Sequence, residues 1–73
     1  MTRSIRTKEY AYFVERLCKA RMEAGLTQVQ VAKKLKRPQS HISNVESGQQ
    51  RVDVVELQNF ARIYKKDIKY FIK

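Results

Sequence analysis

Apolar residues recur at intervals of three and four along the first third of the chain. Together with one arginine they would form a single stripe on a helix, made of Tyr10, Phe13, Val14, Leu17, Ala20, Arg21 and Ala24. Such a stripe is typical of a helix that buries one face. Gly25 follows, and glycine readily takes the left-handed conformation that ends many helices. We therefore predict a helix from about Thr7 to Ala24.

Two short helices are predicted in the middle of the chain, over about residues 27–47. Thr27 and Gln30 have the spacing of a capping box, in which each side chain satisfies a backbone N–H at the helix start. The next helix should begin around Pro38, where a missing N–H costs no helical hydrogen bond, and end at Gly48. The inward-facing residues would be Val31, Ala32, Leu35, Ile42 and Val45. The helix lengths and the short connection suit a helix-turn-helix.

The last third of the chain predicts one longer helix and one short one. Asp53 and Glu56 have the spacing of a second capping box. The apolar series that follows comprises Val54, Leu57, Phe60, Ala61 and Tyr64. Asp67 can cap a short last helix over residues 68–72. Because no strand pattern competes, we predict an all-α fold, a compact bundle of about five helices in a single domain over residues 1–73.

The composition limits the chemistry available to this chain of 73 residues. A domain this small buries only about 60% of its unfolded surface, so its stability should depend on helix packing and oligomerisation. Cys18 and His41 are the only cysteine and the only histidine, which excludes an intramolecular disulfide and a structural zinc site. No apolar run approaches the roughly 20 residues that span a bilayer. We expect a cytoplasmic protein without a metal, a cofactor or a small-molecule ligand.

The charge is strongly positive and unevenly distributed. Sixteen Lys and Arg residues stand against seven Asp and Glu residues, a formal net charge of +9. From Ala24 to Val45 there is no carboxylate, whereas this stretch contains Lys33, Lys34, Lys36 and Arg37. An excess of this kind indicates a polyanionic partner, most often nucleic acid. The positive charge is concentrated on the predicted helix-turn-helix.

The second helix of that pair has an unusual polar face. Opposite its apolar side lie Gln39, Ser40, Ser43, Asn44 and Ser47. Solvated helix faces usually carry Lys and Glu, which are better helix formers than Ser and Asn. Gln and Asn can pair bidentately with adenine in the major groove, and Ser can donate or accept there. An ordinary solvated face remains the alternative, but the chemistry favours reading of DNA base edges.

The segment GLTQVQVAKKLKRPQSHISNVESGQQRVDVVELQNFARIY resembles the Xre-type helix-turn-helix family, which includes the lambdoid phage repressors and Cro. The resemblance runs from about Arg16 to Ile72. It depends on GLTQ, the inward Ala32, RPQSHIS, VESG and DVVEL occurring in this order and spacing. It implies a lambda-repressor-like fold and a sequence-specific regulator of transcription, with repression as the expected role. Such a protein binds double-stranded DNA as a homodimer on a palindromic operator.

The resemblance also implies roles for individual residues. The base-reading positions would be Gln39, Ser40, Ser43 and Asn44. The phosphate-binding positions that it implies would be Gln28, Ser47 and Arg51, and we add Lys36 and Arg37, two departures from the family that place positive charge in the turn. Arg21 and Glu46 match the family's internal ion pair. Lys36 replaces the glycine usual in the turn, at a cost of about 1 kcal/mol if its backbone is left-handed, and Arg37 replaces a usual apolar residue.

For several residues the sequence allows more than one role. For His41 we favour packing over a phosphate contact, and for residues 1–6, with Arg3 and Arg6, a flexible basic terminus over a minor-groove arm. Cys18 is expected to have no redox role. The chain has no second histidine, no glycine-rich loop and no carboxylate pair in its basic region, so we do not expect an enzyme.

The assembly and the functional class also leave alternatives. In the tail, Ile68 and Phe71 would fill the core. The residues left outward, as a dimer interface, would be Ile63, Tyr70 and Ile72. The rival is a monomer whose tail only closes its own core. The alternative function is an antitoxin or other protein-binding module in which DNA binding is secondary.

Overall fold

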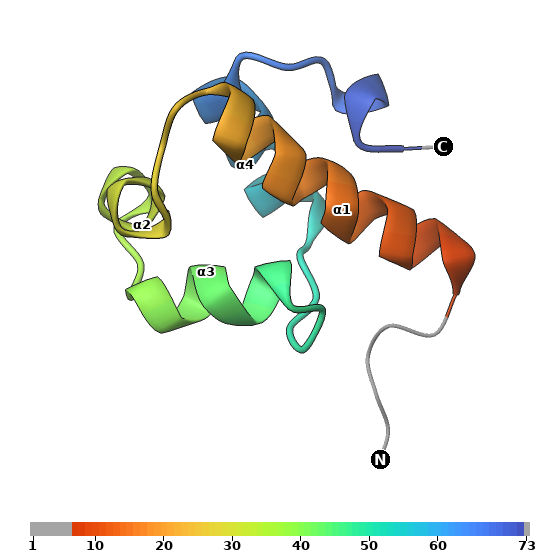
Figure 1. The fold of residues 1–73 in the computed structure, drawn as a ribbon, viewed down its shortest axis with the longest axis horizontal. Helices are drawn as coiled ribbons and strands as arrows, with labels where there is room; N and C mark the ends of the chain where they lie inside the picture. The colour runs from red at the N-terminus through yellow and green to blue at the C-terminus, as the bar shows by residue number, and fades with distance from the viewer. Residues whose placement is uncertain (1–6, 73) are drawn as a thin grey trace.

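The computed structural model describes residues 7–72, and within them the fold is all-α, as predicted. The elements are α1 (Lys8–Glu23), α2 (Gln28–Leu35), α3 (Gln39–Glu46), α4 (Val54–Tyr64) and the 3₁₀ turn η1 (Ile68–Tyr70) (Figure 1). The expected fifth helix is therefore a single 3₁₀ turn, so four α-helices make up the described bundle. The predicted basic arm over residues 1–6 lies outside the described residues.

Side chains cap the helices much as the sequence indicates. At the start of α2 the capping box is complete: Gln30 N donates to Thr27 Oγ1 at 3.1 Å and Thr27 N donates to Gln30 Oε1 at 2.8 Å. The box at α4 is only half formed. Glu56 N donates to Asp53 Oδ1 at 2.8 Å, but the Glu56 carboxylate turns to α3 instead of back to the Asp53 backbone. Pro38 is the extended residue before α3 rather than its first helical residue.

The core is built from the apolar faces of all four helices and the tail. Its fully buried large side chains are Phe60, Phe71, Leu17, Ile42, Val31 and Val45. Two expectations for the first helix are not met. Tyr10 and Phe13 are only half-buried, and Ala24 is exposed because α1 has already ended at Glu23. Phe71 is buried as predicted, so the tail does close the core.

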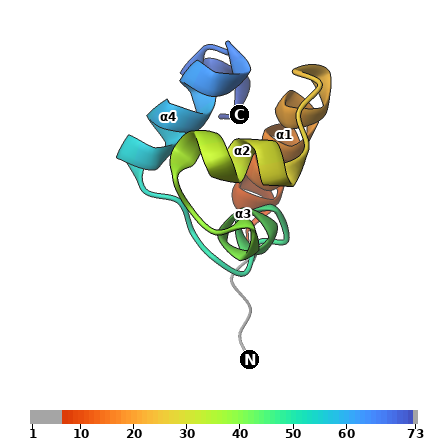
Figure 2. The ribbon, with the colours of Figure 1, turned by 90° about the vertical axis from the view of Figure 1, so that its left-hand side faces the viewer.

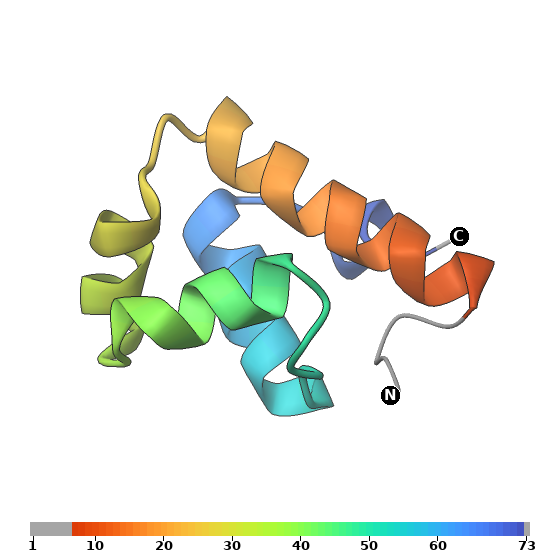
Figure 3. The same ribbon diagram turned by 60° about the horizontal axis from the view of Figure 1, so that its bottom comes forward.

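The α3 helix lies at one edge of the molecule. In Figure 1, α2 is seen nearly end-on while α3 runs across the view beneath α1, so the two helices of the pair are strongly inclined to each other. In Figure 2, α3 is seen end-on at the lower edge of the molecule. The α2 helix lies above it, nearest the viewer, and α1 and α4 lie farther back. When this edge is turned forward, α3 stands in front of α4 (Figure 3). One side of α3 therefore packs inward and the other faces outward.

Lys36 ends α2 in the left-handed conformation, so the turn is not adjusted to avoid it and the cost of about 1 kcal/mol expected for that case applies. Its φ is 59° and its ψ is 43°. The backbone N–H groups that follow close the helix end: Lys36 N donates to Lys33 O at 3.2 Å and Arg37 N donates to Ala32 O at 2.9 Å. Lys65 ends α4 in the same way, with a φ of 57° and a ψ of 46°. Two lysines thus occupy backbone positions that favour glycine.

The Lys36→Gly change should raise the free energy of unfolding, by up to about 1 kcal/mol. Glycine removes the left-handed strain of Lys36, although its extra freedom in the unfolded chain offsets part of the gain. If Lys36 binds a phosphate, as we expect from the sequence, the same change should also weaken DNA binding. Lys65→Gly is the matched control: it should stabilise similarly, by thermal unfolding, and leave DNA affinity unchanged. A Lys36→Gly protein that melts earlier than the wild type would contradict this account of the turn.

Candidate nucleic-acid interface

The outward side of α3 carries the polar residues that the sequence singles out. Ile42 and Val45 are 0% exposed, which fixes the orientation of the helix. The residues exposed on its other side are Gln39, Ser40, Ser43 and Asn44. Ser47, just after the helix, is exposed too, and its hydroxyl donates to Asn44 O at 3.0 Å. A row of short donors and acceptors therefore runs along the outer edge of the molecule, in the chemistry that base edges require.

An ion pair fastens the C-terminal end of α3 to α1. Arg21 Nε lies 2.7 Å from Glu46 Oε2, and Arg21 Nη2 lies 3.1 Å from Glu46 Oε1, a bidentate arrangement. Arg21 Nη1 also donates to Leu26 O at 2.9 Å. The hydrogen bond to Glu46 raises the pKa of the Arg21 guanidinium, while burial opposes this. The contact between Arg21 and Glu46 implied by the resemblance is thus present, and it holds α3 in place.

Gln28 joins the same network from the first residue of α2. Its Nε2 donates to Glu46 Oε1 at 3.0 Å, and the side chain is half-buried. A carboxamide has two N–H donors, so a phosphate contact can coexist with this bond. The helix start adds the positive end of the α2 dipole beside it.

A second polar cluster joins α3 to α4. His41 is 7% exposed, and its Nε2 lies 3.0 Å from both Glu56 Oε1 and Glu56 Oε2. Arg37 Nη2 lies 3.4 Å from each ring nitrogen of His41, and Arg37 Nε lies 3.9 Å from Glu56 Oε2. Packing of His41, favoured over a phosphate contact, is confirmed. The sequence does not predict this cluster, because the spacing of Asp53 and Glu56 indicates a capping box and assigns the Glu56 carboxylate to the start of α4.

Arg51, expected to bind phosphate, lies in the loop between α3 and α4 and contacts α1. Its guanidinium carbon is 4.4 Å from the centre of the Tyr10 ring. Burial raises the pKa of the Tyr10 hydroxyl, and the positive charge of Arg51 opposes that rise. An arginine over an aromatic face is attracted by the ring electrons. This contact orients Arg51 at the edge of the molecule that carries α3.

The predicted positive surface is also present in the structure. Lys33, Lys34 and Lys36 are exposed on α2 and in the turn after it. Two acids of α3 and α4, Glu46 and Glu56, are bound to Arg21 and His41. The cationic side chains therefore face solvent beside α3, where their charges act on a polyanion.

The residues expected at a dimer interface differ in their surroundings. Ile72 is 56% exposed, whereas Ile63 is half-buried against the core. Tyr70 is covered more than expected: Arg16 Cζ lies 3.8 Å and Lys66 Nζ 4.5 Å from its ring centre, and its hydroxyl donates to Glu23. These contacts span up to 54 residues of sequence, and no local pattern signals them.

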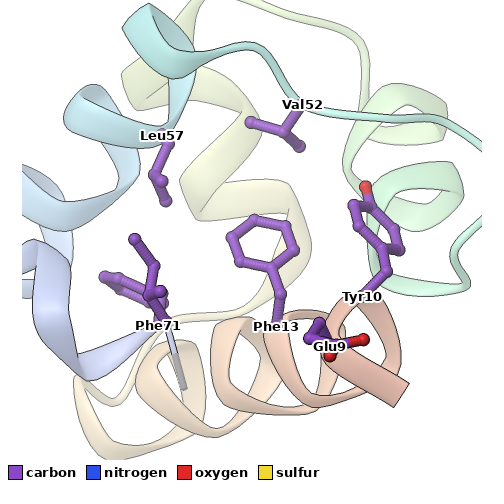
Figure 4. Close-up of a pocket in the computed structure, with 7 residues that line it drawn as sticks. Glu9, Tyr10, Phe13, Val52, Leu57 and Phe71 are labelled. Atoms are coloured by element: carbon purple, nitrogen blue, oxygen red, sulfur yellow. The ribbon is translucent and has the colours of Figure 1, made fainter. Parts of the chain in front are cut away.

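An apolar pocket of about 240 Å³ opens beside Ile72. The other residues that line it are Glu9, Tyr10, Phe13, Val52, Leu57 and Phe71 (Figure 4). They come from the start of α1, the loop before α4, α4 itself and the tail. This end of the molecule therefore has a hollow with a mainly apolar lining.

Two further properties concern the described residues as a whole. Within residues 7–72, no helix is long and apolar enough to cross a membrane. Over the same range, no three His, Cys, Asp or Glu side chains come together as metal ligands.

Comparisons with known proteins agree with this geometry. Residues 13–67 match the family model described as "Helix-turn-helix domain". An "XRE-family like protein from Pseudomonas syringae pv. tomato str. DC3000" has a similar structure, with a TM-score of 0.78 and 37% sequence identity over 85% of this chain and 76% of that chain. No relative is matched among curated proteins. The exposed polar face of α3, its cationic surroundings and these matches show that the chain belongs to the Xre-type helix-turn-helix family of DNA-binding regulators.

Proposed function

We propose that this protein is a sequence-specific transcriptional repressor that inserts α3 into the major groove of a palindromic operator. The observation that supports this most strongly is the row of Gln39, Ser40, Ser43 and Asn44 exposed at the edge of the molecule. The major groove admits one α-helix, and these side chains suit its donors and acceptors. The protein would act on the chromosome, in the nucleoid of the cytoplasm.

Phosphate contacts would flank the reading helix on both sides. On the α2 side we assign them to Gln28, Lys36 and Arg37, and beyond α3 to Ser47 and Arg51. Such contacts set the register of a protein on the duplex without reading sequence. Two of these residues, Gln28 and Arg37, are held by acidic side chains in the structure, so DNA must share or exchange those bonds.

Selection of bound duplexes from a random pool tests the proposal. The expected result is one enriched motif with two-fold symmetry and half-site centres about 34 Å apart, one turn of the duplex. A pool that yields no motif would contradict it and would favour the protein-binding module as the main function. A motif without symmetry would contradict only the dimer.

The dimer is proposed because a single recognition helix reads too few base pairs to be selective. Its surface would include Ile72, with Ile63 and Tyr70 beside it. Ile72 carries exposed apolar area and lies at the pocket of Figure 4, whereas the Tyr70 ring is partly covered by Arg16 and Lys66.

Ile72→Asp is expected to shift the protein to monomer in sedimentation runs across a concentration series. A carboxylate in an apolar contact must be desolvated, which opposes association. Met22→Asp is the matched control, because Met22 is 65% exposed at the opposite end of α1 from the pocket. A wild-type chain that remains monomeric at high micromolar concentration and binds one half-site would contradict the dimer.

A further inference from the structure

The position of Arg37 over His41 indicates stacking rather than an ordinary hydrogen bond. Arg37 Nη2 is 3.4 Å from both His41 Nδ1 and His41 Nε2. An atom in the ring plane at equal distance from both nitrogens would collide with the carbon between them. The guanidinium nitrogen therefore lies over the ring face, while the ring edge at Nε2 meets the Glu56 carboxylate at 3.0 Å.

Few charged groups surround the His41 ring, and each can be assigned to a helix or a turn. In the part of the chain described, the charged groups that contact the ring are Glu56 of α4 and Arg37 of the turn between α2 and α3. Asp53 lies nearby, in the same hollow as Arg37 and Glu56. The α2 cations Lys33 and Lys34 are exposed. From α1, Arg21 reaches α3, but it pairs with Glu46 at the C-terminal end of α3.

Arg37 is held by this cluster but remains within reach of solvent. Its side chain is 46% exposed, against 7% for His41 and 16% for Glu56. It also follows Lys36 directly, in the turn that the proposed function places at the phosphates. A phosphate would bind the guanidinium bidentately and compete with Glu56 for it. If Arg37 leaves, His41 loses a neighbouring cation and keeps a neighbouring carboxylate, which favours the protonated imidazole.

We propose that His41 and Glu56 are positioning residues that hold Arg37 in the free protein, and that transfer of Arg37 to a DNA phosphate is coupled to protonation of His41. This rests on the proposed function, since it names a control on the same DNA-binding surface. The sign follows from linkage: the DNA-bound protein binds more protons than the free protein, so DNA affinity rises as the pH falls. His41 is the chain's only histidine, so no second imidazole contributes to the pH dependence.

The test measures dissociation constants by fluorescence anisotropy at fixed ionic strength from pH 5.5 to 8, on a selected and a random duplex. For the wild type we expect affinity about three- to tenfold higher at pH 5.5 than at pH 8 on both duplexes. His41→Gln keeps an N–H donor for Glu56 but cannot bind the proton, so its affinity should change with pH clearly less than that of the wild type. This variant also retains the terminal amine, so any pH dependence that comes from that group remains in its profile and can be subtracted.

Two further variants separate positioning from general structure. Glu56→Gln no longer holds Arg37, so it should bind DNA more tightly than the wild type at pH 8, with a weaker pH dependence. Arg37→Gln should bind more weakly at every pH and show a flat profile. Thermal melts at each pH establish that every variant is folded at the assay temperature.

The outcomes distinguish this inference from the proposed function. A wild type that binds DNA with a flat profile, a His41→Gln protein with the wild-type profile, or a folded Glu56→Gln protein that binds more weakly at pH 8 would each overturn the inference alone. A wild type that binds no duplex at any pH would overturn the proposed function and this inference with it.

Discussion

Replacing Arg21 with glutamine is expected to lower the free energy of unfolding by about 3 kcal/mol, the low end for breaking a buried ion pair. The change leaves the Glu46 carboxylate, 7% exposed, with Gln28 as its remaining neutral partner. The low end applies because Arg21 keeps some contact with water and Gln28 still donates to the carboxylate. For a domain of this size, such a loss lowers the melting temperature by roughly 10–20 °C.

Glu46→Gln should also destabilise, because it strands the Arg21 guanidinium. The matched control is Glu23→Gln, which removes the same charge from an exposed pair, where Glu23 Oε1 lies 2.9 Å from Lys66 Nζ. Exposed pairs contribute little, so this control should melt close to the wild type. Equal melting curves for Glu46→Gln and the wild type would show that the pair does not stabilise the fold.

Asn44→Ala is expected to reduce binding to the selected duplex by about 1–3 kcal/mol, roughly five- to 150-fold, and to change binding to random duplexes little. An alanine cannot make the bidentate bonds that asparagine offers to adenine. Gln39→Ala should behave in the same direction. Titration of each variant with both duplexes at one salt concentration measures the specificity ratio directly.

The comparison variants for this prediction lie on and off the surface. Gln58→Ala changes an exposed residue of α4, outside the helix-turn-helix, and should bind like the wild type. Arg51→Ala should weaken all duplexes nearly alike and lower the salt slope by about one unit, since one phosphate contact is lost. An Asn44→Ala protein that keeps the wild-type specificity ratio would mean that α3 is not the reader.

Much of the fold follows from local rules that act within a few residues. The capping bonds of Thr27 and Gln30 and the buried Ile42 and Val45 all depend on spacing along one helix. The orientation of α3 follows in turn, because a helix that buries Ile42 must expose residues on its other side. The polar row from Gln39 to Asn44 could therefore be predicted from the sequence.

The local rules failed where a side chain had a choice of partner. Glu56 satisfies the spacing of a capping box with Asp53, yet its carboxylate binds His41 of a different helix. The last segment has an apolar pattern that suits a helix, but it forms only a 3₁₀ turn, and Phe71 is buried just after that turn. The sequence predicts an outward-facing Tyr70, whereas in the structure the Arg16 guanidinium packs against the Tyr70 ring.

The sequence by itself thus determined the four α-helices and their approximate ends, the side of α3 that faces outward and the concentration of positive charge beside it. These depend on helical periodicity and backbone conformation, which are properties of neighbouring residues. Only the tertiary structure decided which polar and charged side chains meet, as with Arg37, His41 and Glu56, or Arg16 and Tyr70. Such contacts join residues up to 54 positions apart. A charged side chain takes the partner that the packing of the helices brings within about 3–4 Å, because Coulomb attraction is strong at that distance and a charge left unpaired after losing its water is costly.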